Sequence, residues 1–165
     1  MIALPDPVAR RAATVIAALI AEGATVATAE SCTGGLIAAA LTSVPGSSEA
    51  VHGGFVTYAN AAKEKMLGVS PVTLAEHGAV SEQTAREMAL GARRETGATY
   101  TVAVTGIAGP DGGTAEKPVG LVWFGLAGPD GVIADKRLFG DLGRAEIRQA
   151  TVLYALDMLK RAMKG

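Results

Sequence analysis

The sequence predicts a three-layer α/β/α sandwich built on a mixed, mostly parallel β-sheet. Two observations favour this fold class: helix-like and strand-like segments alternate through the first half of the chain, and two strand-like segments flank a turn near its end. Alternating helices and strands are typical of a parallel sheet covered on both faces, whereas the late hairpin adds an antiparallel element. The chain has 165 residues, the length of one ordinary domain, so we expect residues 1–165 to form a single domain.

The opening segments predict a helix, a strand and a second helix. Asp6 is expected to cap the first helix, with Pro7 at the first helical position, and apolar residues then recur at helical spacing until Gly23. Residues 25–29 form a short β-type run. After a glycine-containing turn, residues 36–44 carry apolar side chains on one side of a second helix.

The middle of the chain predicts one strand and two helices. Residues 51–58 are rich in β-branched and aromatic side chains and predict a strand. Asn60 is placed to cap a helix that runs to Leu67, and Ser81 is placed to cap a longer helix that ends near Thr96. A glycine follows each of these two helices, as expected for a helix end.

The last part predicts three strands and a final helix. Residues 99–104 form a strong buried strand, and residues 106–117 form a glycine-rich loop with too many breakers for regular structure. Residues 119–126 and 132–139 flank a Gly-Pro-Asp-Gly turn, which predicts a hairpin. The final helix is expected over residues 144–163.

Two segments follow directly after predicted strands and are therefore candidates for function. In open α/β sheets, ligands bind beyond the carboxyl ends of the strands. Residues 30–35 and 105–114 both occupy such positions in the predicted order of elements.

Composition excludes several classes of function. Fifteen Lys and Arg against sixteen Asp and Glu give a formal net charge of −1, which provides no general field for nucleic acid or an anionic membrane. The single cysteine, Cys32, excludes an internal disulfide, and His52 and His77 are too few for a structural zinc site. The first residues lack the apolar core of a secretory signal, and no apolar run has membrane-spanning length. We expect a cytoplasmic protein with no metal and no cofactor.

Ser31 lies where a strand turns into a helix. A hydroxyl there is commonly an N-terminal cap, and Thr33 is a second candidate for that role. Gly34 and Gly35 fall in the first turn, where glycine is unfavourable unless something must approach the backbone N–H groups. Because a helix N-terminus favours negative charge, Ser31 is a candidate nucleophile. Cys32 is a competing one, but without a basic partner it is better explained as a small buried residue.

Lys63 occupies an electrostatically unfavourable position. If Asn60 caps its helix, Lys63 is the third helical residue, where a cation opposes the helix dipole. Partial burial would lower its pKa further, and a lysine of low pKa suits a general base for a serine hydroxyl. The alternative is a solvated lysine beside Glu64 and Lys65. Tyr58, just before this helix, either relays a proton or anchors a ring, or is a half-buried aromatic with a hydrated hydroxyl.

The loop over residues 105–114 is neither a Walker A loop nor a dinucleotide-binding motif. Its glycines could present backbone donors to an anion or an oxyanion. The alternative is a surface loop that turns sharply, although its position after a strand favours function.

Arg144 and Arg148 lie four residues apart near the start of the last helix. Two cations at that positive end are unfavourable unless a bound phosphate offsets them. The alternative is ordinary surface pairing with Asp141 or Glu146.

Several motifs in order resemble those of the CinA C-terminal domain family. They are Ala29 to Gly35, Gly54 to Asn60 with the following Lys63, His77 to Ser81, and Thr105 to Gly113. The resemblance covers about residues 8 to 160. Stand-alone members of this family are nicotinamide-nucleotide amidohydrolases, also called NMN deamidases. We expect no larger N-terminal domain of the kind found in two-domain relatives, so the resemblance is to the stand-alone enzyme.

The resemblance implies hydrolysis of nicotinamide mononucleotide (NMN) to nicotinic acid mononucleotide and ammonia, within pyridine-nucleotide recycling. It implies the α/β/α fold, no metal, Ser31 as nucleophile, Lys63 as its base and Tyr58 close by. The residues expected to bind substrate are Glu30, Thr33, Gly34, Gly35, Thr105 and Gly106, together with Arg144 and Arg148 on the dipole argument above.

Two other functions stay open at this point. The first is a non-catalytic nucleotide-binding module that uses the same pocket, and the second is hydrolysis of a different small amide with a phosphate handle. Alanine-rich helix faces and the family resemblance both favour a homo-oligomer.

Overall fold

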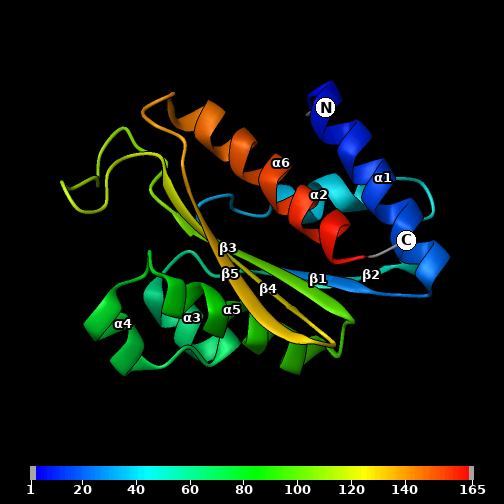
Figure 1. Cartoon of the computed structure of the whole chain (residues 1–165), viewed down its shortest axis with the longest axis horizontal. Helices are drawn as coiled ribbons and strands as arrows, with labels where there is room; N and C mark the ends of the chain where they lie inside the picture. The colour runs from blue at the N-terminus through cyan, green and yellow to red at the C-terminus, as the bar shows by residue number, and fades with distance from the viewer. Residues whose placement is uncertain (1–2, 164–165) are drawn as a thin grey trace.

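The computed structural model describes residues 3–163, and its architecture confirms the predicted α/β/α class (Figure 1). Five strands form one sheet in the order β2-β1-β3-β4-β5: β1 (Val26–Glu30), β2 (Val51–Val56), β3 (Tyr100–Gly106), β4 (Leu121–Gly128) and β5 (Gly131–Leu138). One face is covered by α1 (Asp6–Glu22), α2 (Leu36–Thr42) and α6 (Arg144–Ala162), and a short 3-10 helix, η1 (Ser47–Glu49), follows α2. On the other side lie α3 (Asn60–Leu67), α4 (Pro71–His77) and α5 (Glu82–Thr96).

The strand pairing brings the ends of three parallel strands together. β2, β1 and β3 are parallel neighbours, whereas β4 runs antiparallel to both β3 and β5. Glu30, the last residue of β1, pairs with Val56 on one side and with Val104 on the other. The ladder extends beyond the strands, because Ser31 N–H donates to Val104 O at 3.0 Å and Thr57 N–H donates to Glu30 O at 2.9 Å. The segments that leave these strands therefore start side by side.

Small residues let the helices lie close to the sheet. The core under α1, α2 and α6 contains larger apolar side chains, among them Ile37, Phe124 and Leu156. The core under α3 to α5 contains mainly alanine and a few larger residues. At Gly125 of β4, an added Cβ would lie 2.3 Å from the Ala85 carbonyl oxygen of α5, so this approach requires glycine. The high glycine and alanine content of the chain is thus used for close packing.

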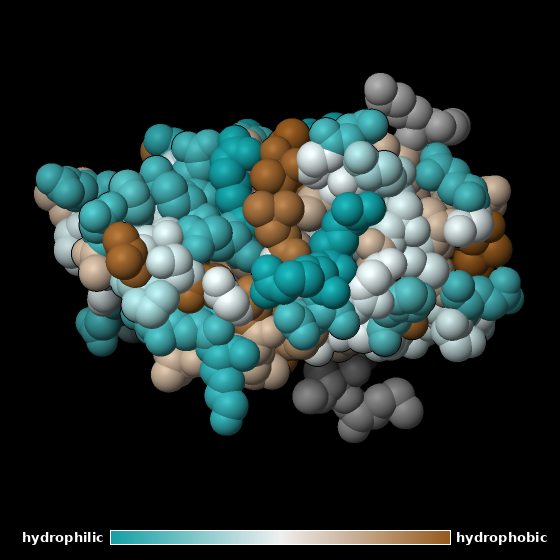
Figure 2. Space-filling view, turned by 90° about the horizontal axis from the view of Figure 1, so that it is seen from below, coloured by the Kyte–Doolittle hydropathy of each residue, from teal (hydrophilic) through white to brown (hydrophobic). Residues whose placement is uncertain are grey.

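The face made by α3, α4 and α5 is mostly polar at its surface. Figure 2 shows this side of the molecule, with an apolar band near the middle of the view and smaller apolar patches toward its two ends. Exposed apolar side chains on these helices are Met66, Val72 and Leu90. Across residues 3–163, none of the helices has both the length and the apolar character that a membrane crossing needs.

Several predicted helix ends are confirmed. Gly23, Gly68 and Gly97 end α1, α3 and α5 in the left-handed conformation. Ser81 caps α5, because its side chain accepts a hydrogen bond from Thr84 N–H at 3.1 Å. The loop before β4 and the turn between β4 and β5 also lie where the sequence predicts them.

Two predicted caps were wrong by one residue. Pro5 precedes α1 and Asp6 is its first residue, with no side-chain cap. Ala59, which has an extended backbone, precedes α3, so Asn60 is the first helical residue and Lys63 is the fourth, not the third.

A short helix, α4, was absent from the prediction. Ser70 caps it by accepting a hydrogen bond from Val72 N–H at 3.2 Å, and Pro71 occupies its first position. This Ser-Pro pair is a helix-start signal that sequence reasoning could have used.

Candidate active site

The segments that leave β1, β2 and β3 enclose an open cleft of about 280 Å³. It is lined by six of the residues predicted for the site, together with parts of the glycine-rich loop: Ser31, Tyr58, Lys63, Thr105, Gly106 and Arg144. Cys32, Asn60, the Ala79–Val80 segment and Asp111 also line it. Of these, Asn60 was considered only as a cap, and Asp111 lies within the loop predicted to bind an anion.

The amine of Lys63 lies against the hydroxyl of Ser31. Lys63 Nζ donates to Ser31 Oγ at 3.0 Å, to Thr57 O at 2.8 Å and to Tyr58 O at 3.2 Å. The side chain is almost completely buried, with 1% of its surface exposed. Within residues 3–163, no carboxylate forms an ion pair with it. Burial disfavours the charged form and lowers the pKa of Lys63 below its ordinary value.

Residues 31–35, which we call the Ser31 turn, are held from the inside by Glu30. The Glu30 carboxylate accepts hydrogen bonds from Thr33 Oγ1 at 2.6 Å, from Ile37 N–H at 2.8 Å and from Ala38 N–H at 3.0 Å. Glu30 and Thr33 are completely buried. The carboxylate therefore satisfies backbone donors at the start of α2, where the helix dipole also favours a negative charge.

The Ser31 turn is held from the outside by Arg148 of α6. Arg148 Nε donates to Cys32 O at 3.1 Å, and Nη2 donates to Thr33 O at 3.2 Å. Five residues predicted to bind substrate belong to this turn or contact it, and they are not among the residues that line the cleft: Glu30, Thr33, Gly34, Gly35 and Arg148. Direct substrate binding by these five residues stays a prediction.

Cys32 is a poor candidate nucleophile in this setting. Its side chain is 6% exposed, and burial raises the pKa of its thiol to about 12. A thiol of that pKa is protonated near neutral pH, and the thiolate is the reactive form. The geometry favours the interpretation of Cys32 as a small buried residue.

Arg144 joins three parts of the cleft. Its Nη1 donates to Gly109 O in the glycine-rich loop at 2.8 Å, and its Nη2 donates to the Tyr58 hydroxyl at 3.0 Å. The Tyr58 side chain is 60% exposed at the mouth of the cleft. In the described part of the chain, neither Arg144 nor Arg148 forms the ion pair with Asp141 or Glu146 that was considered as an alternative.

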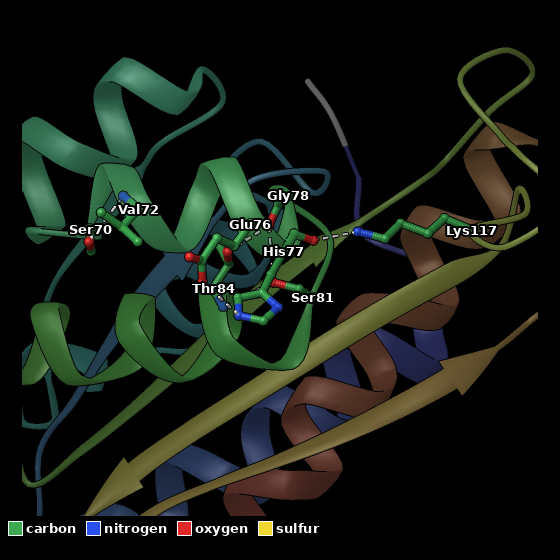
Figure 3. Close-up of polar contacts among 8 residues, drawn as sticks. All are labelled: Ser70, Val72, Glu76, His77, Gly78, Ser81, Thr84 and Lys117. Carbon is green, nitrogen blue, oxygen red and sulfur yellow. Dashed lines mark hydrogen bonds and ion pairs between the residues drawn. The ribbon is translucent and has the colours of Figure 1, made fainter.

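The part of the cleft wall that contains Ala79, Val80 and Thr105 is fixed by hydrogen bonds to backbone carbonyls. Thr105 Oγ1 donates to Ala79 O at 2.8 Å, and Ser81 Oγ and Thr84 Oγ1 donate to Gly78 O at 3.0 and 2.8 Å. Figure 3 shows Lys117 reaching from the glycine-rich loop to the backbone of His77, where its Nζ donates to the carbonyl oxygen at 2.6 Å. The loop is thereby attached to the end of α4, directly before the Ala79–Val80 segment.

The two histidines lie outside the lining of the cleft. His52 Nδ1 is 3.3 Å from Thr96 O, and His77 Nε2 is 3.9 Å from a carboxylate oxygen of Glu76. His52 thus contacts the end of α5 and His77 lies beside its chain neighbour Glu76, and the expectation that neither is a ligand stays a prediction.

Comparison with known proteins gives matches over most of the chain. The sequence-family model of the CinA C-terminal domain matches residues 8–163 of the chain. The nicotinamide-nucleotide amidohydrolase PncC of Escherichia coli K12 is 51% identical over 142 residues, which are 86% of each chain, and that of Enterobacter agglomerans is 55% identical over 88% of each chain. A longer CinA-like protein of Anaeromyxobacter sp. Fw109-5 is 54% identical over 92% of this chain and 37% of its own length.

A solved structure agrees with these sequence matches. The competence/damage inducible protein CihA of Agrobacterium tumefaciens superposes with a TM-score of 0.94 at 52% identity, covering 98% of both chains. The family resemblance drawn from the motifs is therefore confirmed, and the chain belongs to the CinA C-terminal domain family.

Proposed function

We propose that this chain is a nicotinamide-nucleotide amidohydrolase, which converts NMN and water to nicotinic acid mononucleotide and ammonia. Two relatives named for this activity are 51% and 55% identical to it over most of both chains. The observation that carries the proposal is the contact between Lys63 Nζ and Ser31 Oγ inside an open cleft. Hydrolysis of a carboxamide through a serine nucleophile needs a base in such contact with the hydroxyl.

The surroundings of Lys63 suit a neutral amine. A neutral amine has two N–H donors and one lone pair, and two backbone carbonyls, Thr57 O and Tyr58 O, accept from Nζ. The charged amine donates to Ser31 Oγ across the 3.0 Å contact, and loss of its third proton reverses this hydrogen bond. With both remaining donors used on the carbonyls, the lone pair then accepts the proton of the Ser31 hydroxyl. Burial, which lowers the pKa of Lys63, favours this neutral form.

The reaction then proceeds through an acyl-enzyme. Ser31 Oγ attacks the carboxamide carbon while its proton passes to Lys63 Nζ, and the carbonyl oxygen becomes an oxyanion. The C–N bond breaks as Lys63 returns the proton to the nitrogen, and ammonia departs. A water molecule attacks the acyl carbon, gives a proton to Lys63, and releases nicotinic acid mononucleotide as Ser31 regains that proton.

The backbone of the Ser31 turn supplies candidate donors for the oxyanion. The N–H groups of Ser31 and Gly34 already donate to Val104 O and Ser31 O. Those of Cys32 and Thr33 are thus the candidates next to the nucleophile, and the loop over residues 105–109 is the other source. One such donor is typically worth about 3 kcal/mol of transition-state stabilisation.

The nucleotide part of the substrate calls for a cation and a wall for the ring. Arg144 lines the cleft, its guanidinium is oriented by Gly109 O and the Tyr58 hydroxyl, and its side chain is exposed. We assign the 5′-phosphate to Arg144. Tyr58, Thr105 and Gly106 line the same cleft and would contact the pyridine and ribose.

We also infer the setting in which the chain works. The family model spans residues 8–163, which supports a single domain. The reaction belongs to pyridine-nucleotide recycling, and a chain with one cysteine suits the reducing cytoplasm. Alanine-rich helix faces support a homo-oligomer. The formal net charge of −1 provides no general field for nucleic acid or an anionic membrane, so neither is proposed as a partner.

The test is ammonia release from NMN. Wild-type protein should release ammonia, Ser31→Ala and Lys63→Ala should lose nearly all activity, and Ser43→Ala, an exposed serine after α2, should remain active. Free nicotinamide should react poorly, because it lacks the phosphate that contributes binding energy. NMN binding without ammonia release would instead support a non-catalytic nucleotide-binding module, and near-normal turnover by Ser31→Ala would exclude the mechanism.

A further inference from the structure

We propose that Arg148 is a positioning residue that holds the Ser31 turn in the shape needed for catalysis, an inference that rests on the proposed function. Two N–H groups of its guanidinium, on Nε and Nη2, donate to Cys32 O and Thr33 O at 3.1 and 3.2 Å. The guanidinium is planar, so two such bonds fix the positions of both carbonyl groups together.

The Ser31 turn needs an external hold because of its glycines. Gly34 and Gly35 have φ angles of 59° and 102°, in the region that other residues rarely adopt. Glycine reaches many other backbone conformations at little cost, so consecutive glycines make a turn easy to deform. Glu30 ties the inner side of the turn to α2, and Arg148 is the side chain that ties its outer side to α6.

The carbonyl contacts of Arg148 also set the direction of the N–H groups. A peptide unit is planar, and its C=O and N–H point in opposite directions. Fixing Cys32 O therefore fixes the N–H of Thr33, one of the candidate oxyanion donors. Rotation of this peptide plane would turn that donor away from the reacting carbonyl.

This position differs from that of a phosphate ligand. Arg144 lines the cleft, whereas Arg148 lines the outer groove beside α1 with Leu4, Val8 and Val152. A phosphate would compete with the two carbonyl oxygens for the Nε and Nη2 donors of Arg148. Binding of phosphate by Arg148, predicted from the sequence alone, thus becomes one of the outcomes that the test distinguishes.

The test compares Arg148→Met with Arg93→Met. Arg93 is a matched control, because it is also partly buried and its Nε donates to a backbone carbonyl, Thr99 O, at 3.2 Å outside the lining of the cleft. Each variant is assayed for kcat and KM with NMN and for amide hydrogen exchange over residues 31–38. Arg148→Ala is also assayed with added guanidinium at concentrations that leave the wild type fully active.

Arg148→Met should lower kcat by about 10- to 100-fold with KM nearly unchanged, since removing an oxyanion donor outright costs about 100- to 1,000-fold. Exchange over residues 31–38 should become faster, and guanidinium should restore part of the activity of Arg148→Ala but none to Ser31→Ala. Arg93→Met should change none of these readouts.

Two results would overturn the assignment. A raised KM with unchanged kcat would assign Arg148 to the phosphate, and unchanged exchange over residues 31–38 would show that it does not hold the turn. Because exchange requires no turnover, it tests Arg148 even if wild-type protein releases no ammonia, which would contradict the proposed function alone.

Discussion

Lys63 Nζ and Ser31 Oγ lie 3.0 Å apart although 32 positions separate the two residues in the chain. Ser31 leaves the end of β1, and Lys63 lies on α3, the helix that follows the neighbouring parallel strand β2. The same backbone connection supplies two carbonyl oxygens to the amine. A lysine is thus buried with acceptors but no counter-charge among the described residues. This arrangement lowers its pKa, so the amine loses its proton at a lower pH than an exposed lysine does.

The first prediction concerns the pH dependence of the reaction. Burial holds the pKa of Lys63 below 10.5, and only the neutral amine can accept the proton of Ser31. We expect kcat/KM for ammonia release to rise with pH through that lowered pKa and then level off. Lys63→Ala should lose this rise and about 10²- to 10⁴-fold in rate, the usual contribution of a general base. A rate that falls as pH increases over this range would contradict the role of Lys63 as base.

The second prediction concerns stability. Because the pKa of Lys63 is lower in the folded state, the folded protein loses this proton at a lower pH than the unfolded chain does. Between the folded pKa and 10.5, the unfolded state binds more protons, so the free energy of unfolding should rise with pH. Urea unfolding at several pH values should show this rise in the wild type and in Lys65→Met, an exposed lysine on the same helix. The rise should be reduced in Lys63→Met, and equal slopes in all three proteins would refute the prediction.

The third prediction separates Cys32 from Ser31. The thiol of Cys32 has a pKa of about 12 and a buried side chain, so it should be protonated and react slowly with iodoacetamide near neutral pH. Cys32→Ala should retain ammonia release and lose about 1 kcal/mol of unfolding free energy, because a buried sulfur atom is removed. Loss of activity comparable to that of Ser31→Ala would instead assign the nucleophile to Cys32.

Much of the fold could be predicted because local signals and packing agree. Alternating segments, the glycine that ends α1 at Gly23 and the serine that caps α5 at Ser81 are local, and the structure confirms them. The helix α4 has only seven residues, too few for a clear apolar period, and only its Ser70-Pro71 start marks it. Short elements of this kind depend on the neighbours against which they pack.

Less of the site could be predicted, because its contacts join segments far apart in the chain. Position after a strand and an unfavourable helix position identified Ser31 and Lys63. The carbonyl groups that surround the amine leave no sequence signal, since every residue has one. The unfavourable start of α6 likewise marked Arg148, but sequence could not show that its partners are the carbonyls of the Ser31 turn.

The fourth prediction tests how packing positions the base. At Gly91 of α5, an added Cβ would lie 1.9 Å from Leu67 O at the end of α3. Gly91→Ala should therefore displace α3, which carries Lys63, and lower the unfolding free energy by about 1–3 kcal/mol. It should also lower kcat in the folded protein. Leu90→Ala changes the adjacent exposed side chain and should leave kcat unchanged. Equal kcat values for Gly91→Ala and the wild type would show that the position of Lys63 does not depend on this contact.

The last prediction concerns the glycine-rich loop, of which residues 106–109, Asp111 and Gly112 line the cleft. Lys117 attaches the far end of this loop to His77 O at the end of α4 (Figure 3). The partial negative charge at that helix end also stabilises the lysine cation. Lys117→Met removes about 1 kcal/mol of loop stabilisation, so the ordered loop should be about fivefold less populated relative to displaced forms. Because binding uses the ordered loop whereas Ser31 and Lys63 lie on other segments, KM for NMN should rise with little change in kcat. Steady-state kinetics beside Lys160→Met, on the last turn of α6, provide the measurement. A fall in kcat at constant KM would instead show that the loop contributes to the chemical step, as expected if its backbone donors rather than those of the Ser31 turn bind the oxyanion.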